Sequence, residues 1–312
     1  MTEQLQGSPG APVGDPALDL AREGMEIRAR SQWEHFRRRF FRHKLAMTSL
    51  AVLAAVTLAA AFADSVAPYG FEEINIANRS QHPTFEDWHL FGTDRLGRDY
   101  FSRVLYGTRT SISVAFVVAL LSTAIGTVVG ALAGYFRGWL DTLLMRLTDF
   151  VLAVPFLAVV LVVAAFVGRG SPFRIALILS FLLWTTIARI VRGSYLSLRE
   201  KEFVDAARAA GAGHLRIMFR HILPNTLGPI VVNATLTVAL AILLEAVLSF
   251  LGFGIQPPFP ALGKMIDDGK GAMLTDWWLV VMPGLTIVTI CLAINFVGDG
   301  LRDALDPTQP RR

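Results

Sequence analysis

The sequence EFVDAARAAGAGHLRIMFRHILPN occupies residues 202–225 and lies between two long, mostly apolar runs at 175–192 and 227–251. The segment itself is polar, rich in alanine and studded with arginine. A water-compatible stretch between two apolar runs of this length is typical of a loop or short helix on one face of a membrane. The fold then depends on how many such runs the chain has and on which face this segment lies.

Apolar runs long enough to cross a bilayer recur along the chain. Hydrophobic residues make up 53% of the 312 residues, above the share in ordinary soluble domains. A helix needs roughly 20 apolar residues to span the hydrocarbon core, and these runs are apolar all round. The runs are 45–65, 112–135, 144–168, 175–192, 227–251 and 277–297. They predict an all-α polytopic membrane protein with six transmembrane helices, of which the alanine-rich first is only moderately hydrophobic.

The distribution of positive charge predicts the orientation of these spans. A dense basic cluster, FRRRFFRHK at 36–44, directly precedes the first run, and such clusters stay in the cytoplasm. Alternation from there places 192–225 and both termini inside, and 66–109 and 252–276 outside. About 20 of the 29 Lys and Arg residues then lie inside, which is the expected direction of bias.

The first 44 residues do not have the pattern of a cleavable signal, because they are too long and too polar. Residues 1–29 include GSPGAPVGDP, a composition that predicts disorder. In 30–44, aromatic residues at helical spacing lie among arginines, which favours a basic amphipathic helix on the membrane surface. A simple charge anchor for the first span is the alternative. Cys291 is the one cysteine, so no intramolecular disulfide is possible.

The 202–225 segment has the pattern of a helix, a turn and a second helix. Glu202 and Asp205 complement the positive end of a helix dipole, and the alanines after them leave a thin surface that another protein can approach. Gly211 predicts a helix stop, because glycine tolerates positive φ. A second, basic helix leads to Leu223 and Pro224, where proline can start the next span. A plain solvated connector is the alternative, but it needs neither small residues nor ordered ends.

A second motif, HLFGTDRLGRDYFSRVLYGTRTSIS at 89–113, precedes the second span. Its turn-forming and charged positions are Gly92, Thr93, Asp94, Gly97, Arg98, Asp99 and Arg103. The last three could form local ion pairs. A metal or acid–base site built on His89 is the functional alternative, but one histidine with scattered carboxylates is weak evidence for it. We therefore expect a structural cap and neither a catalytic nor a metal site.

Glu245 is a carboxylate towards the outer end of the fifth apolar run. Such a group is costly in a membrane unless it meets water or a partner. It either lines a translocation pathway or contacts a partner subunit, or it makes a hydrogen bond between helices that fixes their packing. Pro155 and Pro283 predict local kinks in their helices.

The 202–225 segment resembles the cytoplasmic coupling motif of ABC importer permeases. The matching positions are Asp205, Ala206, Ala207, Gly211, Leu223 and Pro224. Asp205 replaces the usual glutamate, and His221 replaces the usual isoleucine, with Ile222 beside it. The resemblance implies that this segment docks on an ATPase, and we call 192–225 the coupling segment.

The 89–113 motif is similar to the outward segment of the C-type permease subunit of dipeptide and oligopeptide importers. The stretches LLEAVLSFLGFGIQPP at 243–258 and NFVGDGLRDALDP at 295–307 resemble the same family. The likeness extends over most of 34–307 and implies the type I ABC importer permease fold. The implied parts are a cytoplasmic tail 1–44, a first span 45–65, an outer segment 66–109, a transmembrane domain 110–300 that contains the coupling segment, and a cytoplasmic tail 301–312.

The resemblance also implies partners and a location. These are a homologous permease subunit, two ABC ATPases that carry ATP and Mg, an extracytoplasmic substrate-binding protein and the lipid of a bacterial plasma membrane, with no nucleic acid. The glycine–lysine pairs at 263–264 and 269–270 lack the rest of a phosphate-binding loop, so we expect a non-catalytic subunit without a cofactor. An ion-coupled secondary transporter is the main alternative, a membrane enzyme a distant one, and glutathione or nickel chelates are alternative substrates.

Overall fold

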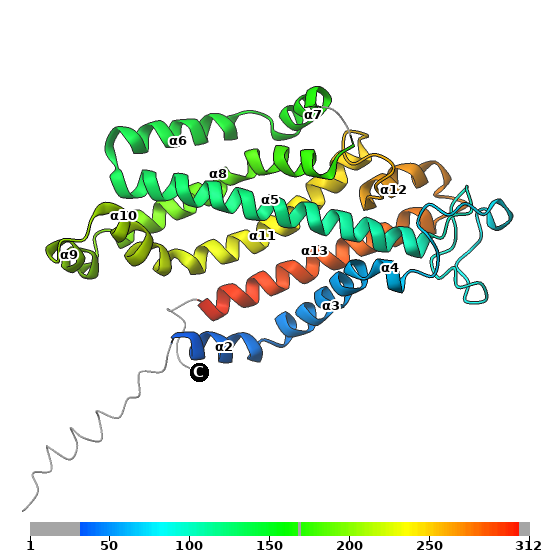
Figure 1. The fold of residues 1–312 in the computed structure, drawn as a ribbon, viewed down its shortest axis with the longest axis horizontal. Helices are drawn as coiled ribbons and strands as arrows, with labels where there is room; N and C mark the ends of the chain where they lie inside the picture. Colours follow the sequence, from blue (N-terminus) through cyan, green and yellow to red (C-terminus); the bar gives the residue numbers. More distant parts are fainter. Residues whose placement is uncertain (1–31, 168–169, 306–312) are drawn as a thin grey trace, which may run out of the picture.

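A computed structural model describes residues 32–167 and 170–305. The regular secondary structure in these ranges is helical, and the long helices lie roughly side by side in one elongated bundle (Figure 1). The predicted disordered tail at 1–29 and the last part of the C-terminal tail lie outside the described residues.

Five helices in the described ranges are long and apolar enough to cross a membrane, and a sharply bent pair makes six if it counts as one span. The long helices are α3 (Lys44–Ala61), α5 (Tyr100–Phe136), α8 (Pro172–Leu198), α11 (Leu223–Phe250) and α13 (Trp278–Leu305). The 37 residues of α5 make a helix about 55 Å long, so its ends extend beyond a hydrocarbon core of about 30 Å. The all-α membrane fold predicted from the apolar runs is confirmed.

The 144–168 run is not one continuous helix. It comprises α6 (Gly138–Ala153) and α7 (Phe156–Val167), which meet at an angle of 86°. Pro155 has no N–H to donate, and its ring disfavours helical backbone at the residue before it. Val154 is accordingly extended, with φ −83° and ψ 137°. The expected local kink is therefore a full break of the helix.

Three glycines four residues apart bring α5 against α8. A Cβ atom added to Gly126 would lie 2.6 Å from the carbonyl oxygen of Trp184, and one added to Gly130 would lie 2.4 Å from that of Ala188. A Cβ added to Gly134 would lie 2.6 Å from the Cβ of Tyr195 and 2.7 Å from the carbonyl oxygen of Arg192. Such small-residue repeats let the backbones of membrane helices approach closely. The sequence analysis missed this repeat, although its spacing is visible in the sequence.

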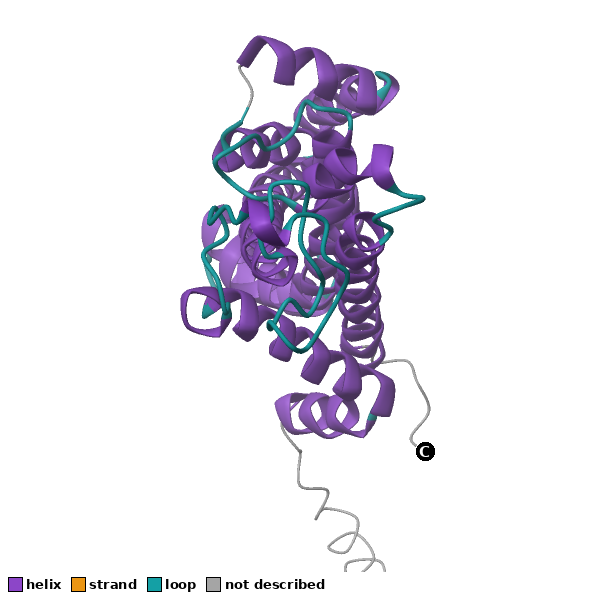
Figure 2. Cartoon of the chain, turned by 90° about the vertical axis from the view of Figure 1, so that its right-hand side faces the viewer, coloured by secondary structure: helices purple, strands orange, loops and turns teal. Residues whose placement is uncertain are grey.

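The two ends of the bundle differ in character. One end carries the basic helix α2 (Gln32–Arg42), the short helix α9 (Glu202–Ala209) and the end of α13. The other carries residues 67–99, which we call the outer cap, together with α12 (Leu262–Gly269); Figure 2 shows their loops lying over the helix ends. The short elements α4 (Ala63–Val66), η1 (Ile76–Asn78) and η3 (Lys270–Ala272) also lie on the outer-cap side.

Candidate coupling segment and outer cap

Helix α9 rests on the bundle through a single buried side chain. Val204 is fully buried and packs in a cluster with Tyr195 and Met218, whereas Glu202, Asp205 and Ala206 are exposed. Ala207 is half-buried beside the same cluster. Asp205 pairs with Arg208 at 2.8 Å on the exposed side. Glu202, Asp205 and Ala206 therefore lie on a surface that faces away from the rest of the chain, whereas Ala207 packs towards the bundle.

Gly211 ends α9 as predicted. Its φ is +79°, its N–H donates to the carbonyl of Arg208 at 2.9 Å, and the N–H of Ala212 donates to Ala207 at 3.0 Å. This pair of bonds is the Schellman arrangement that closes a helix with a left-handed residue. No atom lies within 4 Å of a Cβ added at Gly211. The requirement for glycine is thus conformational and does not come from packing.

The second helix of the segment does not stop before the fifth span. Helix α10 (His214–Arg216) passes through a π-helical turn η2 (Ile217–Ile222) into α11 without a break. Pro224 lies in the first turn of α11, as predicted, but α11 continues the preceding π turn and is not a separate helix. In the π turn, the N–H of Leu223 donates to the carbonyl of Met218. This wider turn loosens the helix ahead of Pro224, which lacks an N–H and would otherwise crowd the preceding turn.

Three contacts join the coupling segment to neighbouring spans. The hydroxyl of Tyr195 in α8 donates to the carbonyl of Met218 at 3.1 Å. The hydroxyl of Tyr135 in α5 lies 2.9 Å from Nδ1 of His214. A salt bridge of 2.6 Å joins Arg137, just beyond α5, to Glu200. A displacement of α9 and α10 would thus be transmitted to α5 and α8 as well as to α11.

The sequence analysis missed an exposed apolar component of this face. Phe203, Leu215 and Phe219 are 39%, 67% and 49% exposed. They belong to α9, α10 and η2, outside the runs that were assigned to the membrane. Grouped exposed apolar side chains mark a contact with another molecule. Their signal in the sequence is weak, because Phe203 and Phe219 adjoin apolar residues that pack inward, such as Val204 and Met218.

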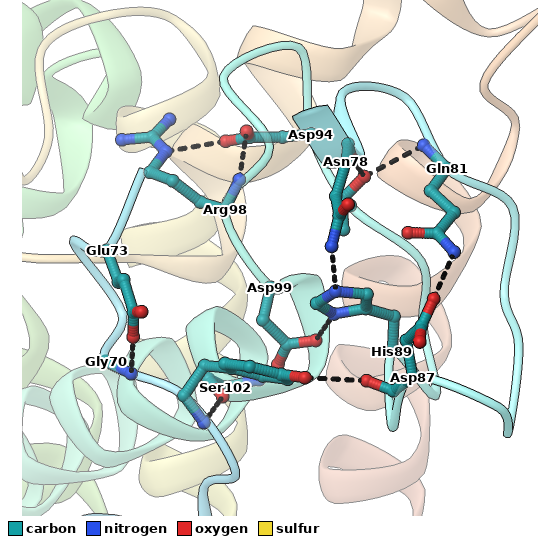
Figure 3. A network of polar contacts seen from close by, with 12 residues as sticks. Gly70, Glu73, Asn78, Gln81, Asp87, His89, Asp94, Arg98, Asp99 and Ser102 are labelled. Carbon is teal, nitrogen blue, oxygen red and sulfur yellow. Dashed lines mark hydrogen bonds and ion pairs between the residues drawn. The ribbon is translucent and has the colours of Figure 1, made fainter. Parts of the chain in front are cut away.

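Asp94 organises the turn at the start of the outward motif (Figure 3). Its Oδ1 accepts from the backbone N–H groups of Leu96 and Arg98 at 2.8 and 3.0 Å. Its Oδ2 accepts from Arg98 Nε at 2.7 Å and from a terminal nitrogen of Arg103 at 3.2 Å. One carboxylate therefore holds the turn and two arginines, and its acceptor positions are filled.

Asp99 pairs with a histidine and not with the neighbouring arginines, so that part of the expected ion-pair set is wrong. Its Oδ1 lies 2.9 Å from Nδ1 of His89, and its Oδ2 caps α5 by accepting from the N–H of Ser102 at 2.7 Å. The side-chain amide of Asn78 lies 3.2 Å from His89 Nε2. Because an amide nitrogen only donates, this places the neutral ring's proton on Nδ1, where it faces Asp99. Figure 3 shows this chain of contacts.

The outer cap is fastened to the last span through Thr93. Its hydroxyl donates to the carbonyl of Asn78 and accepts from the N–H of Gln81. Its own carbonyl accepts from the indole Nε1 of the fully buried Trp278 at 3.0 Å. The described residues contain no group of three or more His, Cys, Asp or Glu that could hold a metal ion. The bonds of Thr93 hold the outer cap against α13.

Gly92 and Gly97 meet a crowded backbone in the outer cap. Both have positive φ, +73° and +77°. A Cβ at Gly92 would lie 2.6 Å from the carbonyl oxygen of Gln81, and one at Gly97 would lie 1.7 Å from that of Asn75. Both conformation and packing therefore require glycine here.

Glu245 in α11 is completely buried and bonded on both oxygens. Ser111 of α5 donates to Oε2 and Ser249 donates to Oε1, each at 2.7 Å. Ser249 in turn accepts from the N–H of Ile255 at 3.2 Å. The carboxylate thus links two long helices and the loop that follows α11.

Two protein families match separate parts of the chain. The family described as binding-protein-dependent transport system inner membrane component matches residues 126–309. The family described as the N-terminal transmembrane domain of oligopeptide transport permease C matches residues 31–83. The chain therefore belongs to the binding-protein-dependent transport system inner membrane components, and the predicted family resemblance is confirmed.

Curated relatives align over almost the whole chain. An oligopeptide transport system permease protein of Haemophilus influenzae is 40% identical, covering 91% of each chain. A dipeptide transport system permease protein of Alkalihalophilus pseudofirmus is 41% identical, covering 89% of this chain and 90% of the relative. A glutathione transport system permease protein of Shigella dysenteriae serotype 1 is 41% identical, covering 89% and 91%.

Proposed function

We propose that this chain is a membrane-spanning permease subunit of an ATP-driven importer for dipeptides or oligopeptides. Its family membership and the names of its relatives support a transport role. The observation that carries the mechanism is the packing of α9 through Val204, in a segment whose His214 and Met218 contact tyrosines of α5 and α8. Such a helix can receive a movement at the surface and pass it into the membrane.

The proposed assembly contains a homologous second permease subunit, two ATPase subunits that bind ATP and Mg, and an extracytoplasmic binding protein that supplies the peptide. The basic helix α2, the coupling segment and the end of α13 share one end of the bundle, and the basic residues there support a cytoplasmic location for this end. Docking of α9 in an ATPase groove would move the inner ends of α5, α8 and α11. The spans would then open alternately inward and outward, without bond chemistry in this chain.

The coupling role is assigned to Glu202, Asp205, Ala206, Ala207 and Gly211, with Leu223 and Pro224 at the join to α11. Exposed Phe203 belongs with this group, because an aromatic side chain is a common anchor in protein interfaces. In the outer cap, the motif residues have a structural role. Glu245 acts in packing, because both of its oxygens are already occupied by serine hydroxyls.

An ion-coupled secondary transporter is a weaker candidate. Such proteins place ionisable groups at a water-filled site within the membrane, whereas Glu245 is buried and fully bonded. Glutathione is an alternative substrate class within the same importer mechanism, since one relative carries that name.

The test combines purification with transport. The chain is co-expressed with its permease and ATPase partners, purified in detergent and reconstituted, and dipeptide uptake and ATP hydrolysis are measured with loaded binding protein. We expect a stable complex and ATP-dependent uptake. Full uptake by the isolated chain, driven by an ion gradient, would overturn the proposal.

Gly211→Val tests the coupling role directly. A left-handed backbone costs a residue with a Cβ about 1–2 kcal/mol, and more for a β-branched residue, so the turn should distort while the spans remain packed. We expect weaker ATPase docking, or hydrolysis without uptake. Gly213→Val is the matched control, because Gly213 has φ −69° and open space around it. Equal coupling in the two variants would contradict the role given to this turn.

A further inference from the structure

A cavity of about 200 Å³, lined by both charged and apolar side chains, lies at the outer end of the bundle. It is enclosed by the turn of the outward motif, the first turn of α5, helix α12 and the start of α13. Its charged lining residues are Asp94, Arg95, Arg98, Arg103 and Asp268. The packing and capping contacts of the outer cap do not account for this cavity.

The cavity contains hydrogen-bond donors that have no acceptor. Asp94 already accepts from four donors, two of them backbone N–H groups. Arg98 uses only its Nε for that carboxylate; its side chain is 26% exposed, and its terminal nitrogens point away from Asp94 in Figure 3 and are open to an incoming acceptor. Arg103 is 11% exposed, and its buried Nε has no hydrogen-bond partner. An unsatisfied buried donor on a charged group is costly.

The charged side chains that line the cavity do not neutralise one another. Three arginines line the cavity against two aspartates, which leaves an excess of one positive charge. Asp268 is half exposed and already pairs with Lys264 at 2.7 Å. A guanidinium group binds a carboxylate through two parallel N–H bonds, a geometry that lysine cannot reproduce. The missing group is therefore an anion, and a carboxylate matches the available donors.

The size and position of the cavity decide where that carboxylate comes from. Pockets that enclose whole small-molecule ligands usually measure about 300–1,000 Å³, so this cavity suits a side chain better than a peptide. Arg95 and Leu96 line it and are exposed, so a residue can enter from the outer surface. Both arginine and exposed apolar side chains are frequent at protein interfaces.

We propose that this cavity receives an aspartate or glutamate side chain of the extracytoplasmic binding protein when that protein docks on the permease. The inference rests on the proposed function, which supplies the partner. The carboxylate pairs with Arg98 and Arg103, and Arg95 attracts it at the entrance.

The experiment measures docking and folding separately. The intact complex is placed in lipid nanodiscs, and the dissociation constant of peptide-loaded binding protein is measured by biolayer interferometry at two salt concentrations. Arg95→Glu is the principal variant, because Arg95 is exposed and makes no ion pair within the described residues. Arg79→Glu is the matched control, since Arg79 is an exposed arginine of the outer cap that does not line the cavity.

We expect Arg95→Glu to weaken docking about tenfold at low salt and less at high salt, because a rim charge acts mainly on association. Arg98→Gln should weaken it at least about tenfold at both salts, and Arg79→Glu should stay near wild type. Replacing the partner's acidic residue with its amide should weaken docking to the wild type and should add little to the loss in Arg98→Gln.

Unchanged docking in Arg95→Glu and Arg98→Gln, with normal docking by the wild type, would overturn this inference and leave the proposed function intact. Absence of docking by the wild type would overturn both. Sodium acetate is added against sodium chloride at equal ionic strength. If acetate stabilises the complex thermally through Arg98 while docking is unaffected, the site binds a free solute and the inference fails.

Discussion

The outer cap and the coupling segment contain similar residue types, but the acidic side chains of their motifs differ in burial and in hydrogen bonding. Each carries turn glycines and charged side chains within a short stretch. In the outer cap the two aspartates of the motif are bonded internally, since Asp94 accepts four hydrogen bonds and buried Asp99 accepts two. In the coupling segment the acidic side chains of Glu202 and Asp205 face solvent.

The glycines of the two regions show the same contrast. Gly97 has φ +77° and faces a carbonyl oxygen at 1.7 Å from an added Cβ, whereas Gly211 has φ +79° and open space. The outer glycine is fixed by its neighbours within the chain. The inner glycine is fixed only by the backbone turn, which leaves its surface available to a partner. A shared motif composition therefore does not imply a shared role.

The largest expected effect is a difference in stability between the alanine variants of Gly97 and Gly211. Gly97→Ala should destabilise the protein by about 3–5 kcal/mol, because the left-handed backbone and the displaced Asn75 carbonyl add their costs. Gly211→Ala should cost only about 1–2 kcal/mol, for the backbone alone. Thermal unfolding and the folded yield in detergent measure the difference. Similar losses in the two variants would remove the contrast between the regions.

Substitutions of Glu245 test how much a buried polar link near the outer end contributes to stability. Glu245→Leu should cost about 2–4 kcal/mol, because the hydroxyls of Ser111 and Ser249 lose their acceptor. Glu245→Gln should cost about 1 kcal/mol, since an amide keeps the shape and hydroxyl groups can rotate to suit it. Unfolding temperature and peptide uptake are the measurements. Normal assembly with no uptake in the glutamine variant would show that the charge itself is required.

The smallest expected effect is a pH-dependent change in stability that arises from Asp267 in α12. Hydrogen bonds from Lys264 and then Lys270 hold the pKa of the Asp267 carboxyl below its ordinary value. A lowered folded-state pKa stabilises the fold above the unfolded-state value of about 4, and this contribution disappears as pH falls through the folded-state pKa.

Asp267→Asn should therefore be less stable than wild type by about half a kcal/mol at pH 7. The difference should shrink below about pH 4. Unfolding temperatures of both proteins across that range provide the measurement. A gap that stays constant, or one that widens on acidification, would contradict the ion-pair explanation.

Much of the site could be predicted because its causes are local. The helix stop at Gly211 follows from glycine's access to positive φ. The cap at Asp99 is also local, because a carboxylate before a helix accepts from the first turn. The partners of Asp99 and Glu245 could not be predicted, since His89 and Ser111 reach them only after the chain has folded back.

The sequence by itself determined the class of fold, because bilayer thickness and the need to satisfy the backbone leave few options for such long apolar runs. Only the tertiary structure decided how those runs meet. It broke the third run at Pro155, carried the coupling segment through a π turn into α11, and set α5 against α8 along three glycines. The two prolines, Pro155 and Pro224, act locally, but the pairing of α5 with α8 depends on contacts between distant residues, and the composition of a single segment does not encode which neighbour it will meet.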